Sequence, residues 1–327
     1  MRRLWNWVGA RRGRALRVAS IAAALGTVPL AVVGLHHLDW RAALAQMTSL
    51  SRTTWVLVMV ASLSQVLVLA TRFWALFPLG ARPSWSWGAR AFGFGQWVNA
   101  FMPGRAGDVL RVVTVGERQR GPTAADATCV ILLEKVIDVV TLGVLVLACA
   151  PALFLGLAAG ALRAALIGGI VLLALGAGLA LLWRYRPSTF SRLRGAAAAW
   201  GRTARGLLTP ARLLTALALG CVAWLAEAWS FALVSGPLGG VHLTMARAIM
   251  TLLALNVGIA VPISVANVGA YEAATAAGLV PFGVPLPQAL AIGAMHHAVQ
   301  VITAGLFALA FWLRDRMAKS PAALPAP

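Results

Sequence analysis

Long apolar stretches recur along the chain, and their length predicts an all-α polytopic integral membrane protein. A bilayer core requires about 20 apolar residues per spanning helix. Six stretches reach that length, at residues 18–38, 53–77, 123–150, 161–183, 213–235 and 287–313. We therefore expect a single transmembrane domain of about six spanning helices over residues 18–313, with a basic N-terminus (1–17) and a short tail (314–327).

Two further apolar stretches, 88–104 and 247–280, are interrupted by glycine, proline and asparagine. Each is too interrupted for one continuous helix and too apolar for a solvated loop. Non-helical backbone at membrane depth is tolerated only where it is buried in protein or lines a cavity. We therefore predict two broken or re-entrant hairpins, whose hinge residues are Pro103, Gly104, Gly107, Pro262 and Gly269.

The chain also matches itself when it is shifted by 162 positions. EKVIDVVTLG (134–143) then falls on HHAVQVITAG (296–305), and Gln65 falls on Glu227. Each resulting unit is a helix, a hairpin and a helix. In the predicted topology, the two units begin on opposite sides of the membrane. Transporters use such inverted repeats to place a site between two equivalent halves. We predict this arrangement for residues 53–150 and 213–313.

The composition supports a membrane protein and excludes several function classes. The chain is 60% hydrophobic and 11% charged, with a mean hydropathy of +0.82. A soluble enzyme, kinase or DNA-binding module of this length needs far more charged surface. The net charge of +19 is explained by basic cytoplasmic segments rather than by nucleic acid. Most basic residues fall inside if the N- and C-termini are cytoplasmic.

The longest basic segment, 184–212, becomes a cytoplasmic connector in this topology. Its expected partner is the anionic inner leaflet, since clustered arginines beside a membrane are attracted to acidic lipids. Simple anchoring of the topology is the alternative interpretation. A small-residue stretch between Gly168 and Gly178 can pack helices within one chain or between chains, which leaves a homo-oligomer open.

Neither a cofactor nor a metal is expected. Cys129, Cys149 and Cys221 lie in apolar stretches without metal-site or disulfide spacing. The neighbours His296 and His297 point about 100° apart on a helix, which does not favour a shared metal. The chain has no phosphate-binding loop of the ATPase type, so any transport would be driven by an ion gradient or by the gradient of the transported molecule itself.

Several ionisable residues fall inside the predicted spans, where a charge costs at least about 2.5–3.5 kcal/mol. Glu134 and Asp138 share one helix face, with Lys135 beside them. These groups can line a polar path or carry a coupling proton. Alternatively, Glu134 or Asp138 pairs internally with Arg105 or Arg111 and only holds a hairpin in place. The complete set of candidate path residues is Asp108, Glu134, Lys135, Asp138, Glu227, Glu272 and Gln300.

The segment PGRAGDVLR (103–111) has the composition of an anion site. Its glycines allow close backbone approach, and the start of a helix presents free N–H groups to an anion. Arg105 and Arg111 add charge-assisted contacts suited to a phosphate. A cytoplasmic topology anchor is the rival interpretation.

The same residues resemble the signature of a known family. Asn99 to Arg111 resembles the N-x-x-x-P-G-R-x-G-E-x-x-R pattern of the lysylphosphatidylglycerol synthase transmembrane region, also called the flippase-like family. EKVID (134–138) resembles its E-R/K-x-x-D element. The segment 262–272 resembles its P-x-x-x-G-x-G-x-x-E element.

The resemblance covers roughly residues 53–313, with two departures. Asp108 replaces the usual glutamate. Of the two glycines expected in the second hairpin, this chain has only Gly269. Because only 14 residues follow the last predicted helix, we expect no aminoacyltransferase domain and no lipid aminoacylation.

The resemblance implies a multi-pass protein of the bacterial inner membrane that translocates a lipid by alternating access. The lipid would be an anionic phospholipid, an aminoacyl lipid or a polyprenyl-linked or glycolipid. Asn99, Arg105 and Arg111 would then bind the lipid phosphate, and the candidate path residues would accommodate its head. A membrane-embedded transferase acting on a polyprenyl lipid and a secondary transporter of a small solute remain alternatives.

Overall fold

The computed structural model describes residues 48, 50–100, 102, 105–116, 122–149, 151, 206, 209–239, 242–259 and 267–319. Within these ranges the chain forms eight α-helices, two 3-10 turns and no strand. The all-α prediction is therefore confirmed. The predicted helices at 18–38 and 161–183, most of the connector 184–212, and the hinge residues Pro103, Gly104 and Pro262 lie outside the described residues.

Four long helices occupy four of the predicted spans. They are α3 (Arg52–Leu76), α6 (Ala124–Cys149), α9 (Pro210–Gly239) and α12 (Leu286–Lys319). By length and composition, α3, α9 and α12 can cross a membrane. α6 has 26 residues, is about 39 Å long at ~1.5 Å per residue and is as apolar on average as the other three, but it carries four charged residues: Asp126, Glu134, Lys135 and Asp138. α12 continues to Lys319, beyond the predicted end at residue 313, because a helix keeps its internal hydrogen bonds outside the hydrocarbon.

Four short helices form the two predicted hairpins. They are α4 (Trp85–Asn99), α5 (Ala106–Gly116), α10 (Met245–Gly258) and α11 (Ala270–Leu279). Their 10 to 15 residues are too few to span a bilayer. α4 packs on α5, and α10 packs on α11. The first hairpin is larger than the predicted 88–104, because α5 extends it to Gly116.

Side-chain caps explain where several helices begin. Ser51 accepts a hydrogen bond from the Thr54 amide at 3.0 Å and starts α3. Before α6, Thr123 and Asp126 bond each other's backbone amides reciprocally, at 2.8 and 3.2 Å. Two short 3-10 turns, η1 (Leu79–Ala81) and η4 (Val280–Phe282), follow α3 and α11.

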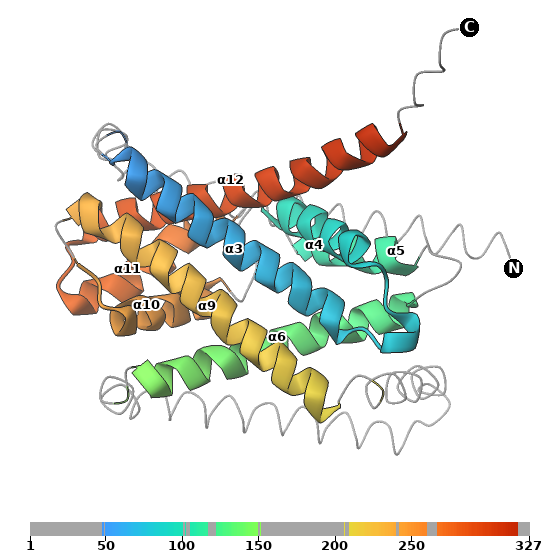
Figure 1. Cartoon of the computed structure of the whole chain (residues 1–327). Helices are drawn as coiled ribbons and strands as arrows, with labels where there is room; N and C mark the ends of the chain where they lie inside the picture. Colours follow the sequence, from blue (N-terminus) through green and yellow to red (C-terminus); the bar gives the residue numbers. More distant parts are fainter. Residues whose placement is uncertain are drawn as a thin grey trace, which may run out of the picture.

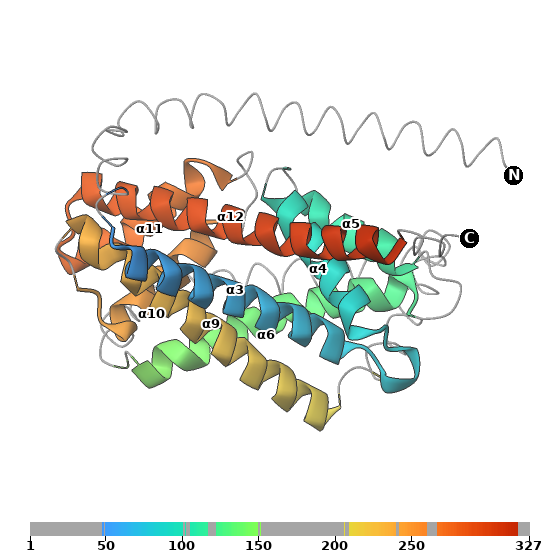
Figure 2. The same ribbon diagram turned by 45° about the horizontal axis from the view of Figure 1, so that its top comes forward.

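The helices pack in the same pattern twice (Figures 1 and 2). α3 and α9 lie side by side and run in opposite directions through the centre, with the α4–α5 pair at one end and the α10–α11 pair at the other. α3 contacts α12 as α9 contacts α6, and α4 contacts α12 as α10 contacts α6. Within the described residues, each unit is therefore a long helix, two short helices and a long helix.

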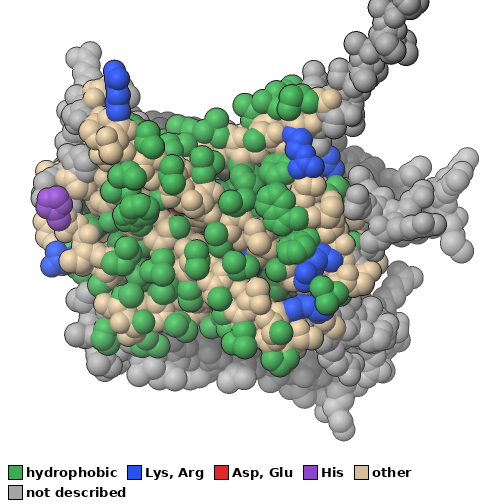
Figure 3. Space-filling model, viewed as in Figure 1, with side chains coloured by type: hydrophobic (Ala, Val, Ile, Leu, Met, Phe, Trp, Pro, Cys, Tyr) green, Lys and Arg blue, Asp and Glu red, His purple; other side chains and the backbone are tan. Residues whose placement is uncertain are grey.

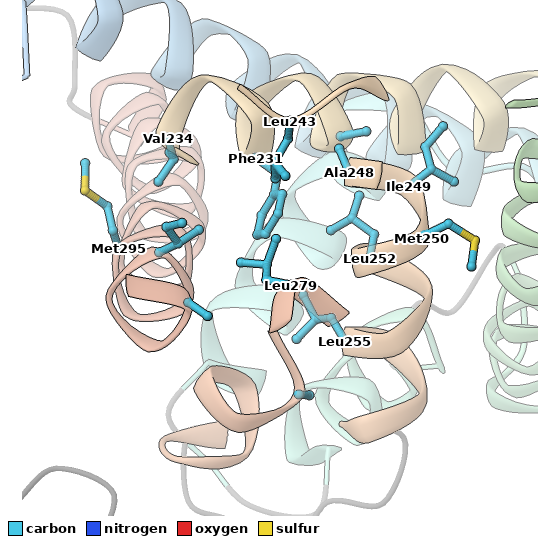
Figure 4. Packing of buried hydrophobic residues seen from close by; sticks show 14 of the residues in the cluster. Phe231, Val234, Leu243, Ala248, Ile249, Met250, Leu252, Leu255, Leu279 and Met295 are labelled. Atoms are coloured by element: carbon cyan, nitrogen blue, oxygen red, sulfur yellow. The ribbon is translucent and has the colours of Figure 1, made fainter. Parts of the chain in front are cut away.

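Each hairpin has its own apolar core. In Figure 4, Phe231 of α9 points toward Leu252 of α10 and Leu279 of α11. The other cluster contains Phe73, Phe92 and other side chains of α3 to α6. The outer faces are also apolar. Figure 3 shows hydrophobic side chains over the middle of one face and Lys and Arg toward its two ends, as expected for helices surrounded by lipid.

Candidate functional site

A polar cavity of about 260 Å³ lies where the two units meet. A neighbouring lobe of about 180 Å³ shares seven of its lining residues. Four charged side chains line the cavity: Arg105, Lys135, Asp138 and Glu227. Six carboxamides line it as well: Gln65, Gln96, Asn99, Asn256, Asn267 and Gln300. Carboxamides both donate and accept hydrogen bonds, so the lining can hold a polar group of either kind.

The two central helices are joined by hydrogen bonds inside this region. Gln65 of α3 donates through Nε2 to Oε2 of Glu227 on α9 at 2.6 Å. The hydroxyls of Ser62 and Ser230 lie 2.8 Å apart on the same two helices. All four side chains are buried. The contact therefore fixes α3 against α9 at the centre of the protein.

Two lining residues have an unusual backbone. Arg105 and Asn267 each have φ of 55°, and among the described residues they are the only non-glycines with positive φ. They are 162 positions apart. Arg105 immediately precedes α5, and Asn267 lies three positions before the first residue of α11. A non-glycine residue in this conformation costs about 1–3 kcal/mol. The same local strain in both hairpins brings two polar side chains to one cavity.

Close contact between α4 and α5 depends on glycine. The Gly107 amide donates to Oδ1 of Asn99 at 2.7 Å, and Asn99 also donates to Asp108 at 3.2 Å. A Cβ on Gly107 would lie 1.8 Å from the Gly95 carbonyl oxygen. Asn99 thus stabilises the start of α5 while it lines the cavity.

Arg111 is engaged in a buried network rather than in the cavity. Its Nη2 lies 2.5 Å from Oε2 of Glu134, and its Nη1 lies 3.3 Å from Asp108. The guanidinium also lies over the rings of Phe73 and Phe92, at 4.1 and 4.8 Å. Neither Arg111 nor Glu134 is among the lining residues. This network joins α5 to α6 and to the apolar core.

Asp138 has a different partner from the ones considered from the sequence. It forms an ion pair with the buried Arg72 of α3 at 2.7 Å, and it also lines the cavity. Lys135, one turn before it, has no ion-pair or hydrogen-bond partner in the described part of the chain. The nearest carboxylate to Arg105 is Asp108, at 3.9 Å, and the Arg105 side chain is 42% exposed. Among the described residues that line the cavity, Arg105 and Lys135 are therefore the cations available to a ligand.

The family model of the lysylphosphatidylglycerol synthase transmembrane region matches residues 16–308. The chain belongs to this family. No curated protein and no solved structure matches it. Family membership and the apolar helices make this a multi-pass membrane protein with a lipid-related role. The family's first motif falls on the α4–α5 hairpin, where Asn99 and Arg105 line the cavity and Arg111 is buried.

Glu272, in the third of the family's motifs, has a local structural contact. It accepts a hydrogen bond from the Gly269 amide at 2.6 Å and lies 2.9 Å from Nδ1 of His297. The Tyr271 ring stacks on His297, and its hydroxyl lies 2.7 Å from His296. Glu272 thus fixes the start of α11 against α12, whereas Tyr271 lines the cavity.

The structure divides the candidate residues into two groups. Those that line the cavity are Asn99, Arg105, Lys135, Asp138, Glu227 and Gln300. Those in packing or helix-start contacts outside its lining are Gly107, Asp108, Arg111, Glu134, Gly269 and Glu272. The lining also contains Gln65, Gln96, Asn256, Asn267, Trp224 and Tyr271, none of which was among the candidates. For Gln65 a signal existed, since it aligns with Glu227 in the internal match.

Proposed function

We propose that the protein moves a lipid between the two leaflets of the membrane, with the head passing through the cavity and the hydrocarbon chains remaining in the bilayer. The observation that carries the proposal is the polar cavity itself, enclosed by helices whose outer faces are apolar. Family membership adds a lipid-related role. We place the protein in a bacterial inner membrane with both termini in the cytoplasm, as the distribution of arginines favours.

Arg105 and Lys135 are the residues we assign to the lipid phosphate. Both line the cavity, and neither has a carboxylate within 3.5 Å in the described structure. Arg111 is not part of this assignment, because Glu134 and Asp108 occupy its guanidinium. Charge-assisted hydrogen bonds to a phosphate contribute about 1.5–3 kcal/mol each.

Alternating access is supported by the repeated packing pattern. Each contact between long and short helices in one unit has a counterpart in the other, and α3 and α9 run in opposite directions. We propose that the two units are inverted repeats related by a two-fold axis near the Gln65–Glu227 contact. Exchange of shape between two equivalent units would open the cavity to one side and then to the other.

The side chains that line the cavity favour passage of a lipid head group over catalysis by a membrane-embedded transferase. A metal-assisted transferase needs free carboxylates that converge on one ion. Here Asp138 pairs with Arg72, and Glu227 accepts from Gln65. The described lining therefore presents two available cations and several neutral amides, which fits a phosphate-bearing head.

The test uses purified protein in phosphatidylcholine vesicles that contain a minor fraction of phosphatidylglycerol. Periodate does not cross the bilayer and cleaves the diol of this head, so it reports the lipid in the outer leaflet. Arg105→Gly removes the cation and suits the positive φ of this position. The loss of one phosphate contact should slow movement about tenfold or more.

Arg52→Gln is the matched control, because it removes the same charge from the exposed start of α3. It should move the lipid at the wild-type rate. The proposal is wrong if wild-type protein moves phosphatidylglycerol no faster than empty vesicles. The phosphate assignment is wrong if Arg105→Gly matches the control.

A further inference from the structure

An apolar groove of about 290 Å³ lies between α4 and α12. Phe94 and Trp97 line it from α4. Gly305, Ala308, Leu309 and Trp312 line it from α12. None of these side chains is ionisable. From Gly305 to Trp312 the α12 wall extends about 10 Å along the helix axis.

The groove continues the lobe of the polar cavity along the same two helices. Ala100, directly after α4, and Val301 and Ala304 of α12 line the lobe. Residues three or four positions apart share one face of a helix. Trp97 therefore lies one turn from Ala100, and Gly305 lies one turn from Val301. The lining thus changes from polar to apolar along one continuous seam between α4 and α12.

We propose that this groove holds a hydrocarbon chain of the lipid whose head occupies the cavity, and that the α4–α12 seam is where the lipid enters and leaves. This inference rests on the proposed function. A polar cavity that adjoins an apolar groove is complementary to an amphiphile, since each part of the ligand meets a surface of its own polarity. A soluble solute would use the polar part alone.

Gly305 keeps the groove open. A Cβ at this position would lie 3.3 Å from Nε1 of Trp97, which is already a tight contact. The longer side chain of leucine would extend between the two helices and fill the space next to Trp97. Gly143, 162 positions earlier in α6, provides a matched comparison, because a Cβ there meets nothing within 4 Å. Both glycines lie inside long helices, so leucine improves the helix propensity equally at both.

The first experiment compares Gly305→Leu with Gly143→Leu in the phosphatidylglycerol vesicle assay. Gly305→Leu should slow lipid movement by about tenfold or more, and Gly143→Leu should leave it unchanged. Thermal unfolding of both variants shows whether each is folded. Equal rates in two folded variants would overturn the inference and leave the proposed function standing.

The second experiment stays informative if Gly305→Leu does not fold. Phosphatidylglycerol with a diazirine in its acyl chain is photolysed in vesicles with wild-type protein, and adducts are located by mass spectrometry. Adducts should be several-fold enriched at Trp97, Leu309 and Trp312 over the more exposed Val139 and Leu214. Labelling in proportion to exposure would contradict a chain site. Enrichment without lipid movement by wild-type protein would support the groove and refute the translocase.

Discussion

The buried ion pair between Arg111 and Glu134 leads to a quantitative prediction. The two side chains are 1% and 2% exposed, and their closest atoms are 2.5 Å apart. Removing one partner of such a pair costs about 3–5 kcal/mol, because the remaining charge stays buried. Glu134→Leu should therefore lower the ratio of folded to unfolded protein by about two to three and a half powers of ten. Asp108, 3.3 Å from Arg111, should keep the loss near the lower value.

A double-mutant cycle tests whether this cost belongs to the pair. Arg111→Met should destabilise the protein as well, although its stem still packs on Phe73 and Phe92. Combining it with Glu134→Leu should recover much of the loss, since replacing a buried ion pair by apolar side chains is often neutral. Thermal unfolding in detergent, followed by the fluorescence of the 13 tryptophans, measures all three variants. Single variants that unfold like wild type, or a double variant with the summed loss, would refute the reasoning.

Three further substitutions have defined outcomes. Gly107→Ala should prevent accumulation of folded protein, because its Cβ would lie 1.8 Å from the Gly95 carbonyl oxygen, whereas Gly143→Ala, with open space, should unfold at or above the wild-type temperature. Gln65→Glu would place two carboxylates at the present 2.6 Å contact with Glu227, where they must share a proton. Because the present hydrogen bond would be lost and the two groups would oppose each other, Gln65→Glu should lower the unfolding temperature measured in detergent. Asp138→Asn leaves the Arg72 guanidinium buried without its counter-ion and should lower the unfolding temperature more than Arg52→Gln does.

The long helices were predictable from the sequence because hydropathy over a bilayer thickness is a one-dimensional signal. α3, α6, α9 and α12 occupy predicted spans to within a few residues, except where α12 continues beyond the hydrocarbon length. Of α5 only the start was expected, because Asp108 and Arg111 follow the end of the apolar stretch at residue 104. In the structure both are partnered, Arg111 by Glu134 and Asp108 by Asn99, so their charges are compatible with a buried helix.

The candidate site was predictable only in part because a buried charge does not reveal its partner. Glu134 and Asp138 share one helix face, yet Glu134 pairs with Arg111 and is enclosed by packing, whereas Asp138 pairs with Arg72 and still lines the cavity. The partners come from α3 and α5 through tertiary contacts, so the spacing of residues along α6 does not predict which carboxylate lines the cavity. Gln96 gave a weaker signal still, since a single amide in an apolar helix is as compatible with packing as with a cavity.

The proposed inverted repeat also explains why amides stand opposite charges in the cavity. Three pairs of lining residues are separated by 162 positions: Gln65 and Glu227, Arg105 and Asn267, and Asp138 and Gln300. Each pair combines one charged side chain with one carboxamide. Near a two-fold axis a residue faces its own counterpart, so two identical charges would meet at contact distance and repel each other. The 2.6 Å bond between Gln65 and Glu227 is the direct case, because a carboxamide satisfies the carboxylate that a second glutamate would oppose. Opposed amides would therefore let two equivalent units close on each other and still leave the charges of Arg105 and Lys135 for the head of the proposed lipid.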